Sequence, residues 1–417
     1  MAPIASPAMA AFDVHAVRSR FPALSRAESG RPVAYLDGPG GTQVPAEVVE
    51  AMSHRLRVGT ANIGGTFGAS READTVTVAA REAMADFLGG RPEEVAFGQN
   101  MTSLTFSVSR ALAREWGPGD EVVVTRLDHD ANVTPWRLAA ADRGATVRVV
   151  HFDPADGTLD LGHLEQAVGE RTRLVAVGAA SNALGTVPPV RRVADLAHAA
   201  GALVFVDAVH YAPHRLIDVA ALGADFLACS AYKFFGPHTG ALWGRSGLLE
   251  SLEAYKVVPA PSSGPGKWET GTQSFESLAG VAAAVDYLGS LGEGGTRRER
   301  LAAALAAIRV YEESLAARFL AGVAGMPHLR LYGLADPARL AERTPTFSLG
   351  VEGLSPDEAA RCLGEQGIHA WSGDYYAVGV MEHLGVARQG GLLRLGFVHY
   401  NTAEEVDRAL AALAGLG

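Results

Sequence analysis

The feature that most constrains the fold is a regular alternation, from about residue 90 onward, of short apolar runs with helical patterns. A helical pattern such as Pro189–Ala200 stops at Gly201, as a helix C-terminus commonly does. The apolar runs are rich in Val, Leu and Phe and have the length of buried strands: Glu121–Thr125, Val147–Phe152, Leu174–Val177, Leu203–Asp207 and Phe226–Ser230. Strands that alternate with helices in this way predict an α/β fold with a mostly parallel sheet.

A different texture follows Gly264–Lys267, where long segments rich in Ala, Leu, Glu and Arg replace the alternation. The elements predicted there are a helix over Arg297–Leu320, strands over Pro345–Val351 and Leu392–Phe397, and a helix that opens at the capping box of Ser355 and Glu358. The chain has 417 residues, more than the roughly 250 to 300 at which a single core stops growing. We therefore expect an N-terminal arm over residues 1–30 that packs on the small domain, a large domain over 31–276 and a smaller α+β domain over 277–417.

The charge balance and the cysteine count exclude several classes of partner. The 36 basic and 46 acidic residues give a net charge of -10, which repels nucleic acid backbones and anionic lipid surfaces. No stretch is long and apolar enough to span a bilayer, and the first twelve residues lack the basic segment of an export signal. Cys229 and Cys362 are too few for a disulfide framework, which fits a reducing compartment. We expect a cytoplasmic protein without nucleic acid or membrane partners.

Lysine is rare in this chain, occurring only at Lys233, Lys256 and Lys267. Arginine carries the rest of the positive charge, but arginine cannot lose its proton and form an imine, whereas lysine can. Lys233 lies in the apolar and aromatic run AYKFFGPHTGALWG, where a charged amine is costly unless it has a function. Lys256 and Lys267 lie in segments rich in Pro, Ser and Gly and are expected to be exposed loop residues. Lys233 is therefore the candidate catalytic lysine.

Polar residues follow three of the predicted strands, in the segments 125–132, 207–210 and 230–233. Ligands of α/β sheets bind beyond the carboxyl ends of the strands. A carboxylate at Asp207 could hold a pyridine nitrogen protonated, which turns pyridoxal phosphate (PLP) into an electron sink. Lys233 follows just past the next strand, and neighbouring strands lie about 5 Å apart, a gap that PLP spans. Either residue alone is more often a cap or a solvated side chain, so the pair carries the prediction.

Longer motifs give the chain a family resemblance. The run SNALGTVPPV to GALWG over residues 181–244 resembles the centre of the class V aminotransferase, cysteine desulfurase-like family. YLDGPGGTQVP (35–45), DHDANVTPW (128–136) and LRLGFVHYNTAEEVDR (393–408) extend the resemblance, in order, over nearly the whole chain. It implies the architecture of fold-type I PLP enzymes: a large domain with a mostly parallel, seven-stranded type of sheet between helices, and a smaller α+β C-terminal domain. It also implies that pyridoxal 5'-phosphate is the cofactor.

The resemblance implies a role for each residue around the pyridine ring. Lys233 would hold the cofactor as a Schiff base and remove the substrate α-proton, and His129 would stack on the ring. Asp207 would pair with the ring nitrogen, while Asn182 and His210 would reach the ring hydroxyl or the substrate. His210 stands where desulfurases usually have Gln, and imidazole can make the same hydrogen bond.

The phosphate end is implied in the same way. Tyr232 takes the place of the His that commonly precedes the lysine. Thr272, in GKWETGTQ, matches a residue that family dimers lend to the phosphate of the neighbouring subunit, which implies a homodimer with shared active sites. The phosphate itself is expected where an apolar run gives way to a helix and backbone N–H groups are free, with a nearby hydroxyl: Asn100, Met101, Thr102 and Ser230.

The substrate side of the site is implied by Arg394, which matches the arginine that grips the α-carboxylate of an amino acid. The glycine-rich stretches 38–42, which includes Gly40, and 61–68 are expected to line the entrance and leave room for a bulky substrate. Asp374, Tyr375 and Tyr376 are candidates for contacts with the leaving group or the side chain.

One departure from the family changes the expected chemistry. Cysteine desulfurases attack the substrate sulfur with a loop cysteine just before that arginine, and Tyr376 stands at this place in WSGDYYAVGVMEHLG (371–385). Cys229 and Cys362 are expected to be packed core thiols instead. By analogy with relatives that lack the cysteine, we expect desulfurase-like or C–S lyase chemistry, that is, β-elimination without a persulfide. Transamination is the alternative, and epimerisation or racemisation is third.

Two other classes of protein compete with this interpretation. A dinucleotide-binding oxidoreductase would need a third glycine after the GPGGTQ turn at 38–43 and a ribose-binding acid, and the sequence lacks both. A non-catalytic scaffold on the same fold would keep the yellow colour of bound PLP but show no exchange of the α-proton. No Walker loop or HExxH motif appears, and no metal site is expected.

Overall fold

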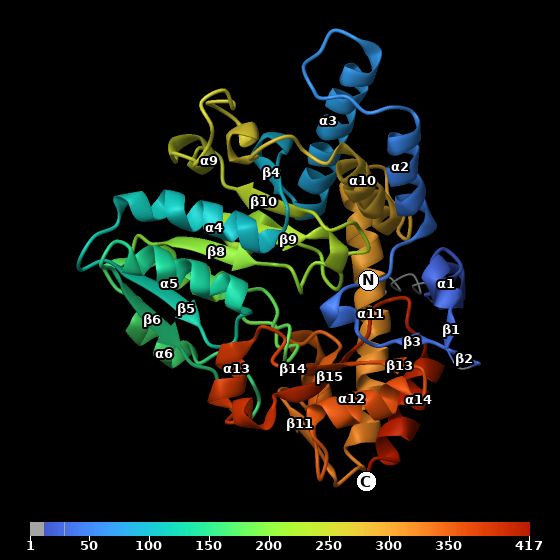
Figure 1. Cartoon of the computed structure of the whole chain (residues 1–417). Coiled ribbons are helices and arrows are strands. Elements are labelled where there is room, and N and C mark those ends of the chain that lie inside the picture. Colours follow the sequence, from blue (N-terminus) through green and yellow to red (C-terminus); the bar gives the residue numbers. More distant parts are fainter. Residues whose placement is uncertain (1–11, 29) are drawn as a thin grey trace, which may run out of the picture.

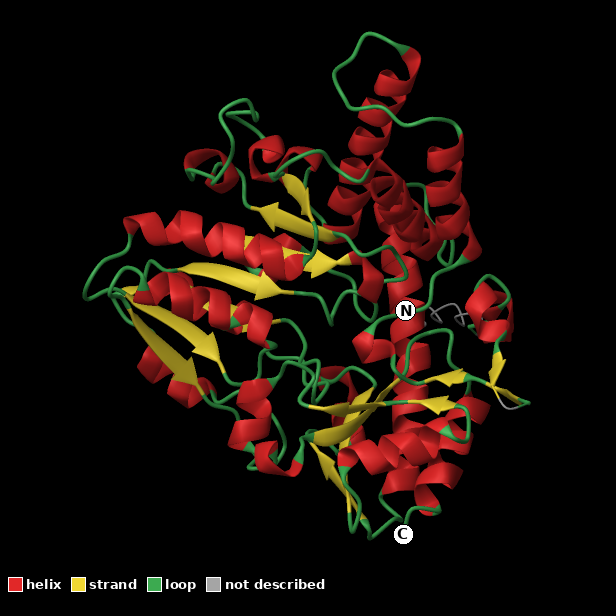
Figure 2. Ribbon diagram, viewed as in Figure 1, coloured by secondary structure: helices red, strands yellow, loops and turns green. Residues whose placement is uncertain are grey.

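The computed structural model describes residues 12–28 and 30–417, and a seven-stranded sheet forms its centre (Figures 1 and 2). Of its strand pairs, only the two made by β10 are antiparallel, which confirms the predicted mostly parallel sheet. In spatial order the strands are β4 (Val95–Gly98), β10 (Gly240–Gly244), β9 (Phe226–Ser230), β8 (Leu203–Asp207), β7 (Thr172–Gly178), β5 (Glu121–Thr125) and β6 (Thr146–Val150).

Helices cover both faces of this sheet, so its central strands are apolar on both sides. One face packs against α2 (Ala46–Arg57), α3 (Gly68–Leu88), α6 (Leu161–Ala167), α7 (Val190–Ala199), α8 (Val219–Leu222) and α10 (Phe275–Gly289). The other face packs against α4 (Met101–Leu112), α5 (Thr134–Ala141) and α9 (Leu248–Ser251). Burial on both faces explains why β5, β8 and β9 have the predicted bounds.

A second, four-stranded antiparallel sheet lies beside the first (Figure 1). Its strands are, in spatial order, β11 (Leu329–Tyr332), β12 (Thr346–Val351), β15 (Leu392–Gly396) and β14 (Trp371–Gly373). It shares a core with α11 (Arg297–Val323), α12 (Pro356–Gly364) and α14 (Ala403–Ala414). The predicted capping box is present, because the Ser355 side chain accepts from the Glu358 N–H and the Glu358 side chain accepts from the Ser355 N–H. No described helix combines the length and the apolar content needed to cross a membrane.

The 27-residue helix α11 connects the two cores. Its first half, with Leu301 and Ile308, packs in the core of the large sheet, and its second half, with Leu315 and Phe319, packs in the core of the small sheet. The predicted boundary between residues 276 and 277 falls within α10, and the division into domains stays a prediction.

Residues 1–11 of the expected N-terminal arm lie outside the described residues. The arm continues as α1 (Val14–Arg18), whose Arg18 Nη1 donates to the Tyr400 carbonyl at 2.6 Å and whose Nη2 pairs with Glu405 at 2.9 Å. The chain then forms the hairpin β1 (Ala27–Glu28) and β2 (Arg31–Pro32), followed by β3 (Ala34–Tyr35), which pairs with β13 (Ile368–His369). The N-terminal part of the chain is thus held against C-terminal elements.

Two expectations about single residues are wrong. Lys267 is buried, and its Nζ donates to the carbonyls of Glu250 at 2.6 Å and Leu252 at 2.9 Å, at the end of α9. A loop rich in Pro, Ser and Gly can still fold over a helix end, so its composition does not reveal burial. Cys362 is partly exposed on α12 rather than packed in the core, whereas Cys229 is buried as expected.

Candidate active site

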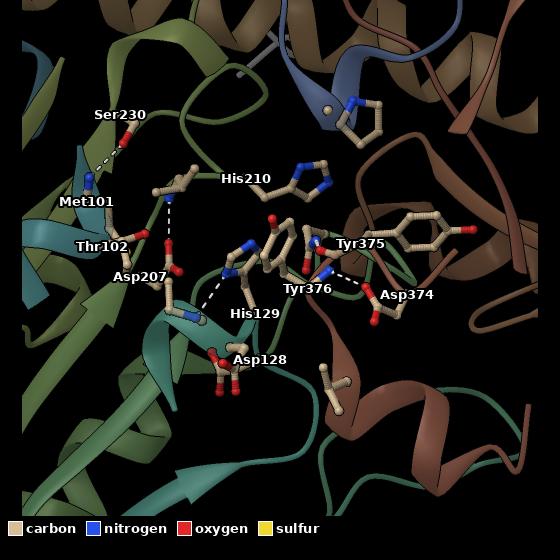
Figure 3. Close-up of a pocket in the computed structure, with 18 of the residues that line it drawn as sticks. Met101, Thr102, Asp128, His129, Asp207, His210, Ser230, Asp374, Tyr375 and Tyr376 are labelled. Carbon is tan, nitrogen blue, oxygen red and sulfur yellow. Dashed lines mark hydrogen bonds between the residues drawn. The ribbon is translucent and has the colours of Figure 1, made fainter. Parts of the chain in front are cut away.

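A cavity of about 1320 Å³ opens at the carboxyl ends of the parallel strands, between the two sheets (Figure 3). Both parts of the chain line it, as expected for a ligand site of an α/β sheet. The structure brings nearly all the predicted site residues to this one cavity: Gly40, Asn100, Met101, Thr102, His129, Asn182, Asp207, His210, Ser230, Tyr232, Lys233, Asp374, Tyr375, Tyr376 and Arg394.

Lys233 ends the short 3-10 helix η6 (Ala231–Lys233) that follows β9, and its side chain is buried. Its Nζ donates to the carbonyl of Pro39. Burial, followed by the charge of Arg394, lowers the pKa of the lysine from 10.5 to about 7. Phe235, two residues later, has a φ of 71°, a left-handed conformation that a non-glycine residue adopts only where its surroundings impose it. The turn therefore delivers a buried amine that is easily deprotonated.

Asp207 is the last residue of β8. Its Oδ1 accepts from the Val209 N–H at 2.9 Å, and its other oxygen has no hydrogen-bond partner among the described residues. Burial raises the pKa of this carboxyl to about 6, and the Lys233 charge opposes that shift. A cationic N–H of a ligand in the cavity would supply the missing partner.

A second buried carboxyl, Asp128, lines the cavity next to His129 and was missed by the sequence reasoning. Its Oδ2 accepts from the Thr125 hydroxyl, and its Oδ1 accepts from Asn132 Nδ2 at 3.1 Å. Burial raises its pKa to about 7, and the nearby Asp207 adds to the shift. The DHDAN motif contains this residue, but only the histidine was assigned a role.

His129 caps the short helix η5 (Asp130–Asn132) through Nδ1, which accepts from the Ala131 N–H at 3.0 Å. Burial, then the charges of Lys233 and Arg394, lower its pKa to about 4. The imidazole is therefore neutral near pH 7 and can present a flat face to an aromatic ring. The Tyr376 ring stacks on it, with centroids 5.5 Å apart and planes inclined by 19°.

Arg394 and Asn182 form a linked pair on the small-sheet side of the cavity. Arg394 is buried on β15, and its Nη1 donates to the Asn182 carbonyl at 2.8 Å. Its guanidinium carbon lies 4.1 Å from the centre of the Tyr375 ring. Asn182 Nδ2 donates to the Tyr375 carbonyl at 2.9 Å, while the buried Asn182 Oδ1 has no partner among the described residues. Arg394 thus keeps N–H groups free to bind a carboxylate.

His210 lines the cavity and also connects the two sheets. Its Nε2 lies 2.9 Å from the Thr346 hydroxyl and 3.2 Å from the Thr344 hydroxyl. Burial lowers the pKa of the imidazole well below its usual value. Nδ1 is the ring nitrogen left for a ligand, so the predicted contact with a hydroxyl has to use this atom.

The start of α4 lies at one end of the cavity (Figure 3). Asn100 caps the helix, and the Met101 N–H donates to Ser230 Oγ at 2.9 Å. The Thr102 N–H has no partner among the described residues, and the Ser230 hydroxyl keeps its own proton to donate. A Cβ at Gly240 on β10 would lie 2.4 Å from the Asn100 carbonyl carbon, so glycine lets this helix start approach the sheet. The predicted phosphate residues therefore lie together.

Tyr232 and Gly40 form another wall of the cavity. The Tyr232 ring stacks on His238, with centroids 5.1 Å apart, and lies 5.2 Å from Lys233 Nζ. A Cβ at Gly40 would lie 2.4 Å from Trp371 Nε1, so only glycine leaves room for this indole. The first glycine-rich stretch therefore borders the cavity as expected.

The loop that contains Asp374, Tyr375 and Tyr376 has an unusual backbone. Tyr375 and Tyr376 have consecutive positive φ angles of 56° and 58°. The Asp130 N–H donates to the Tyr376 carbonyl at 2.7 Å, and the Tyr376 N–H donates to Asp374 Oδ1 at 2.9 Å. These contacts fix the loop over the cavity.

Some predicted residues do not reach the cavity of their own chain. Thr272 is exposed and outside it, and its hydroxyl accepts from Asn62 Nδ2 at 3.5 Å. The stretch 61–68, expected at the entrance, does not line the cavity, because it lies in the connection from α2 to α3. Cys229 and Cys362 do not line it either.

The residues that are brought together fit PLP. The free oxygen of Asp207 suits a ring N–H, the buried Asn182 Oδ1 lacks a donor, and the start of α4 suits a phosphate. Lys233 is a buried amine whose pKa is lowered, as imine formation requires. In the described part of the chain, no cluster of three or more His, Cys, Asp or Glu side chains suits a metal ion.

Comparisons with known proteins show the family to which the chain is similar. The family model for aminotransferase class V matches residues 34–409. A cysteine desulfurase of Serratia proteamaculans is 33% identical over 421 residues, covering 96% of this chain and 98% of the relative. An uncharacterised Mycobacterium tuberculosis protein, MT3887, is 34% identical over 410 residues, covering 98% of this chain and all of the relative.

Solved structures show the same likeness. The apo cysteine desulfurase of Thermococcus onnurineus aligns with a TM-score of 0.85 at 28% identity, covering 100% of this chain and 99% of that one. The cysteine desulfurase CsdA of Escherichia coli aligns with a TM-score of 0.83 at 27% identity, covering 98% and 99%. PLP is the cofactor that members of this family use. The chain belongs to the class V aminotransferase family of PLP-dependent enzymes.

Proposed function

We propose that the protein catalyses β-elimination from an α-amino acid, in a desulfurase-like or C–S lyase reaction that uses no persulfide. The observation that carries the proposal is that Lys233 and Arg394 line the same cavity, whereas no cysteine of the described chain lines it. Tyr376 lies in the loop where the resemblance places the sulfur-attacking cysteine. Curated relatives are named cysteine desulfurases, which supports a substrate with sulfur on its β-carbon.

Bound PLP would supply an electron sink that stabilises negative charge at the substrate Cα. Asp207 is positioned to hold a proton on the ring nitrogen, His129 to cover one ring face, and the start of α4 with Ser230 to bind the phosphate. Arg394 binds the substrate carboxylate through its free N–H groups and so fixes the orientation of Cα. Lys233, with a pKa of about 7, accepts the α-proton at Nζ.

The fate of the β-substituent follows from the missing nucleophile. Without a cysteine beside the substrate, sulfur has no acceptor in the described part of the cavity and leaves with its substituent as a thiol or sulfide. The remaining fragment takes up water and releases ammonium, which gives pyruvate from a substituted alanine. Atoms balance as one conjugate and one water giving one thiol, one pyruvate and one ammonium.

Product analysis tests this branch of the chemistry. Purified enzyme is incubated with PLP and cysteine conjugates, and we expect thiol, pyruvate and ammonium in equal amounts. Lys233→Ala should form none of them, and Tyr376→Phe should keep the product pattern. A keto acid that retains the β-substituent, formed without ammonium, would make the enzyme an aminotransferase. Inversion at Cα without consumption of the amino acid would make it an epimerase or racemase.

A homodimer with shared sites is part of the proposal. Thr272 is exposed and contacts Asn62 in the connection between α2 and α3. Helices α2 and α3 and the connection between them also carry exposed apolar side chains of the kind that protein interfaces cover: Val49, Leu56, Val58, Ile63, Phe67 and Val78. A partner that packs on these side chains would be positioned to receive Thr272 at its phosphate site. A cytoplasmic location stays a prediction that rests on the cysteine count.

A further inference from the structure

We infer that the cavity selects an amino acid whose side chain is large, apolar and aromatic, an inference that rests on the proposed function. The first observation is size. At about 1320 Å³ the cavity exceeds the ~300 to 1,000 Å³ of most small-molecule sites. The cofactor and the residue that a partner subunit would contribute would fill part of this volume, and the rest leaves room for a substrate side chain.

The position of the substrate side chain follows from the strand register. Arg394 on β15 pairs across the sheet with Trp371 on β14. Directly paired residues of antiparallel strands project from the same face, with Cβ atoms about 5 Å apart. A carboxylate held by Arg394 therefore lies beside the Trp371 indole.

Trp371 is held in place on its other side by Gly40. The close approach of the indole to this glycine puts it next to Pro39, whose carbonyl accepts from Lys233 Nζ. An amino acid with its carboxylate at Arg394 and its Cα at Lys233 would thus point its side chain past Trp371. This indole is 53% exposed in the single chain, so its surface is free to contact a ligand.

Tyr376 supplies a second aromatic surface at the same cavity (Figure 3). Its ring is 71% exposed although its backbone is fixed by Asp130 and Asp374 and its ring is stacked on His129. A rigid exposed aromatic ring loses little entropy when a ligand packs on it. Phe106 and Val378 also line the cavity, as does the buried Met381.

Charge at the cavity excludes an acidic side chain. Lys233 and Arg394 are the only lysine and arginine among the described residues that line the cavity. Lys233 acts at the substrate Cα and Arg394 binds the α-carboxylate, so neither is left for a second carboxylate. Acidic groups lie at the cavity instead, including Asp130 and Asp374, and a second carboxylate on the substrate would be repelled by them.

The acidic groups at the cavity also have hydrogen-bond or ion-pair partners of their own. Asp130 Oδ1 accepts from the Thr134 hydroxyl at 2.9 Å, and Asp374 Oδ1 accepts from the Tyr376 N–H. Glu382 pairs with Arg126 at 3.5 Å. An aromatic or large apolar side chain needs none of these groups, and it can pack between Trp371 and Tyr376.

Binding of amine-free carboxylates tests the inference without turnover. The PLP-loaded wild-type enzyme is titrated by calorimetry with propionate, 3-phenylpropionate, glutarate and 6-aminohexanoate, which correspond to alanine, phenylalanine, glutamate and lysine without the α-amine. We expect 3-phenylpropionate to bind at least about tenfold more tightly than the other three, as burial of one aromatic ring allows. Glutarate or 6-aminohexanoate binding as tightly as 3-phenylpropionate would overturn the inference.

Variants separate this inference from the proposed function. Trp371→Ala and Tyr376→Ala should each weaken 3-phenylpropionate about 3- to 10-fold and leave propionate unchanged. Tyr255→Ala, an exposed tyrosine outside the cavity, is the matched control and should change neither. Equal affinities in all three variants would refute the aromatic contact. Arg394→Ala should weaken every probe, and its failure to do so would instead refute the α-carboxylate site on which the proposed function depends.

Discussion

At the scale of single residues, burial sets the protonation states in the cavity. It lowers the pKa of Lys233 to about 7 and of His129 to about 4, and it raises the pKa of Asp207 to about 6. Each shift favours the neutral form, because a low-dielectric interior penalises charge. Lys233 and Asp207 can therefore change their protonation state near neutral pH when a charged ligand enters. At this pH the lysine is also ready for imine formation.

The lowered lysine pKa predicts a pH-dependent stability of the PLP-free protein. Between about pH 7 and 10.5, Lys233 binds fewer protons folded than unfolded, so its contribution to the free energy of unfolding rises with pH; it is most unfavourable below pH 7. PLP-free Lys233→Met should therefore be more stable than the PLP-free wild type below pH 7, by on the order of 2 to 5 kcal/mol. The gain should vanish toward pH 10.5 in thermal melts across this range.

Lys256→Met removes a lysine outside the cavity and is the matched control. It should show no comparable pH-dependent gain. If Lys233→Met raised the free energy of unfolding by the same amount at pH 6 and at pH 10, this would contradict a lysine pKa lowered by burial.

Most of the site residues predicted from the sequence line one cavity, but the side chains around them were predicted less well. Lys233 and Asp207 could be found because each follows an apolar strand. Asp128 was missed because a carboxylate beside an assigned histidine looks like a solvated turn residue until its burial is known. Trp371 was missed because it neighbours Arg394 only through the register of strands β14 and β15. The local sequence does not specify that register.

At the scale of elements, the predicted strand bounds were confirmed where burial on both faces leaves a continuous apolar run in the sequence. β5, β8 and β9 are buried along their whole length and have the predicted bounds. β4 and β10 were not predicted, because VAFG and GALWG are short and contain glycine. Loop packing is harder to predict than strands, as the buried Lys267 shows.

Lys267 gives a prediction at the element scale. Its Nζ binds two carbonyls at the end of α9, and Lys267→Met would leave both without this donor inside the protein. We expect a loss of about 1 to 3 kcal/mol in the free energy of unfolding, measured by urea denaturation of the PLP-loaded protein. The control Lys256→Met, which removes one bond to the Ala260 carbonyl at 3.1 Å, should cost less. An unchanged unfolding midpoint for Lys267→Met would show that these bonds do not stabilise the fold.

At the scale of the whole molecule, the cavity depends on both sheets. Lys233, Asp207 and the start of α4 come from the large sheet, while Arg394 and Trp371 come from the small one. Helix α11 packs in both cores and so couples the two halves of the cavity. This assembly of distant segments followed from the family resemblance, since no local pattern places residue 394 beside residue 182.

The homodimer that we propose, with shared sites, predicts complementation between two inactive variants. Lys233→Ala and Thr272→Asp are each purified, the second carrying a carboxylate that repels phosphate, and the two are unfolded and refolded together. Half of the dimers then combine the variants, and each has one intact site, so we expect about a quarter of wild-type activity. Thr272→Ser, refolded in the same way, should stay active alone. No recovery in the mixture would place Thr272 in its own subunit's site, and a Thr272→Asp variant that stays active alone would place it outside the site altogether.

If this enzyme carries PLP on Lys233, as we propose, borohydride reduction should fix the cofactor to that lysine. Purified protein is scanned for near-visible absorbance, treated with borohydride, digested and analysed by peptide mass spectrometry, with Lys233→Ala in parallel. We expect a yellow protein whose reduced cofactor is found on the peptide that contains Lys233, and a Lys233→Ala variant without the near-visible absorbance band. A wild type that stays colourless when supplied with PLP, or a cofactor fixed to Lys256 or Lys267, would contradict it.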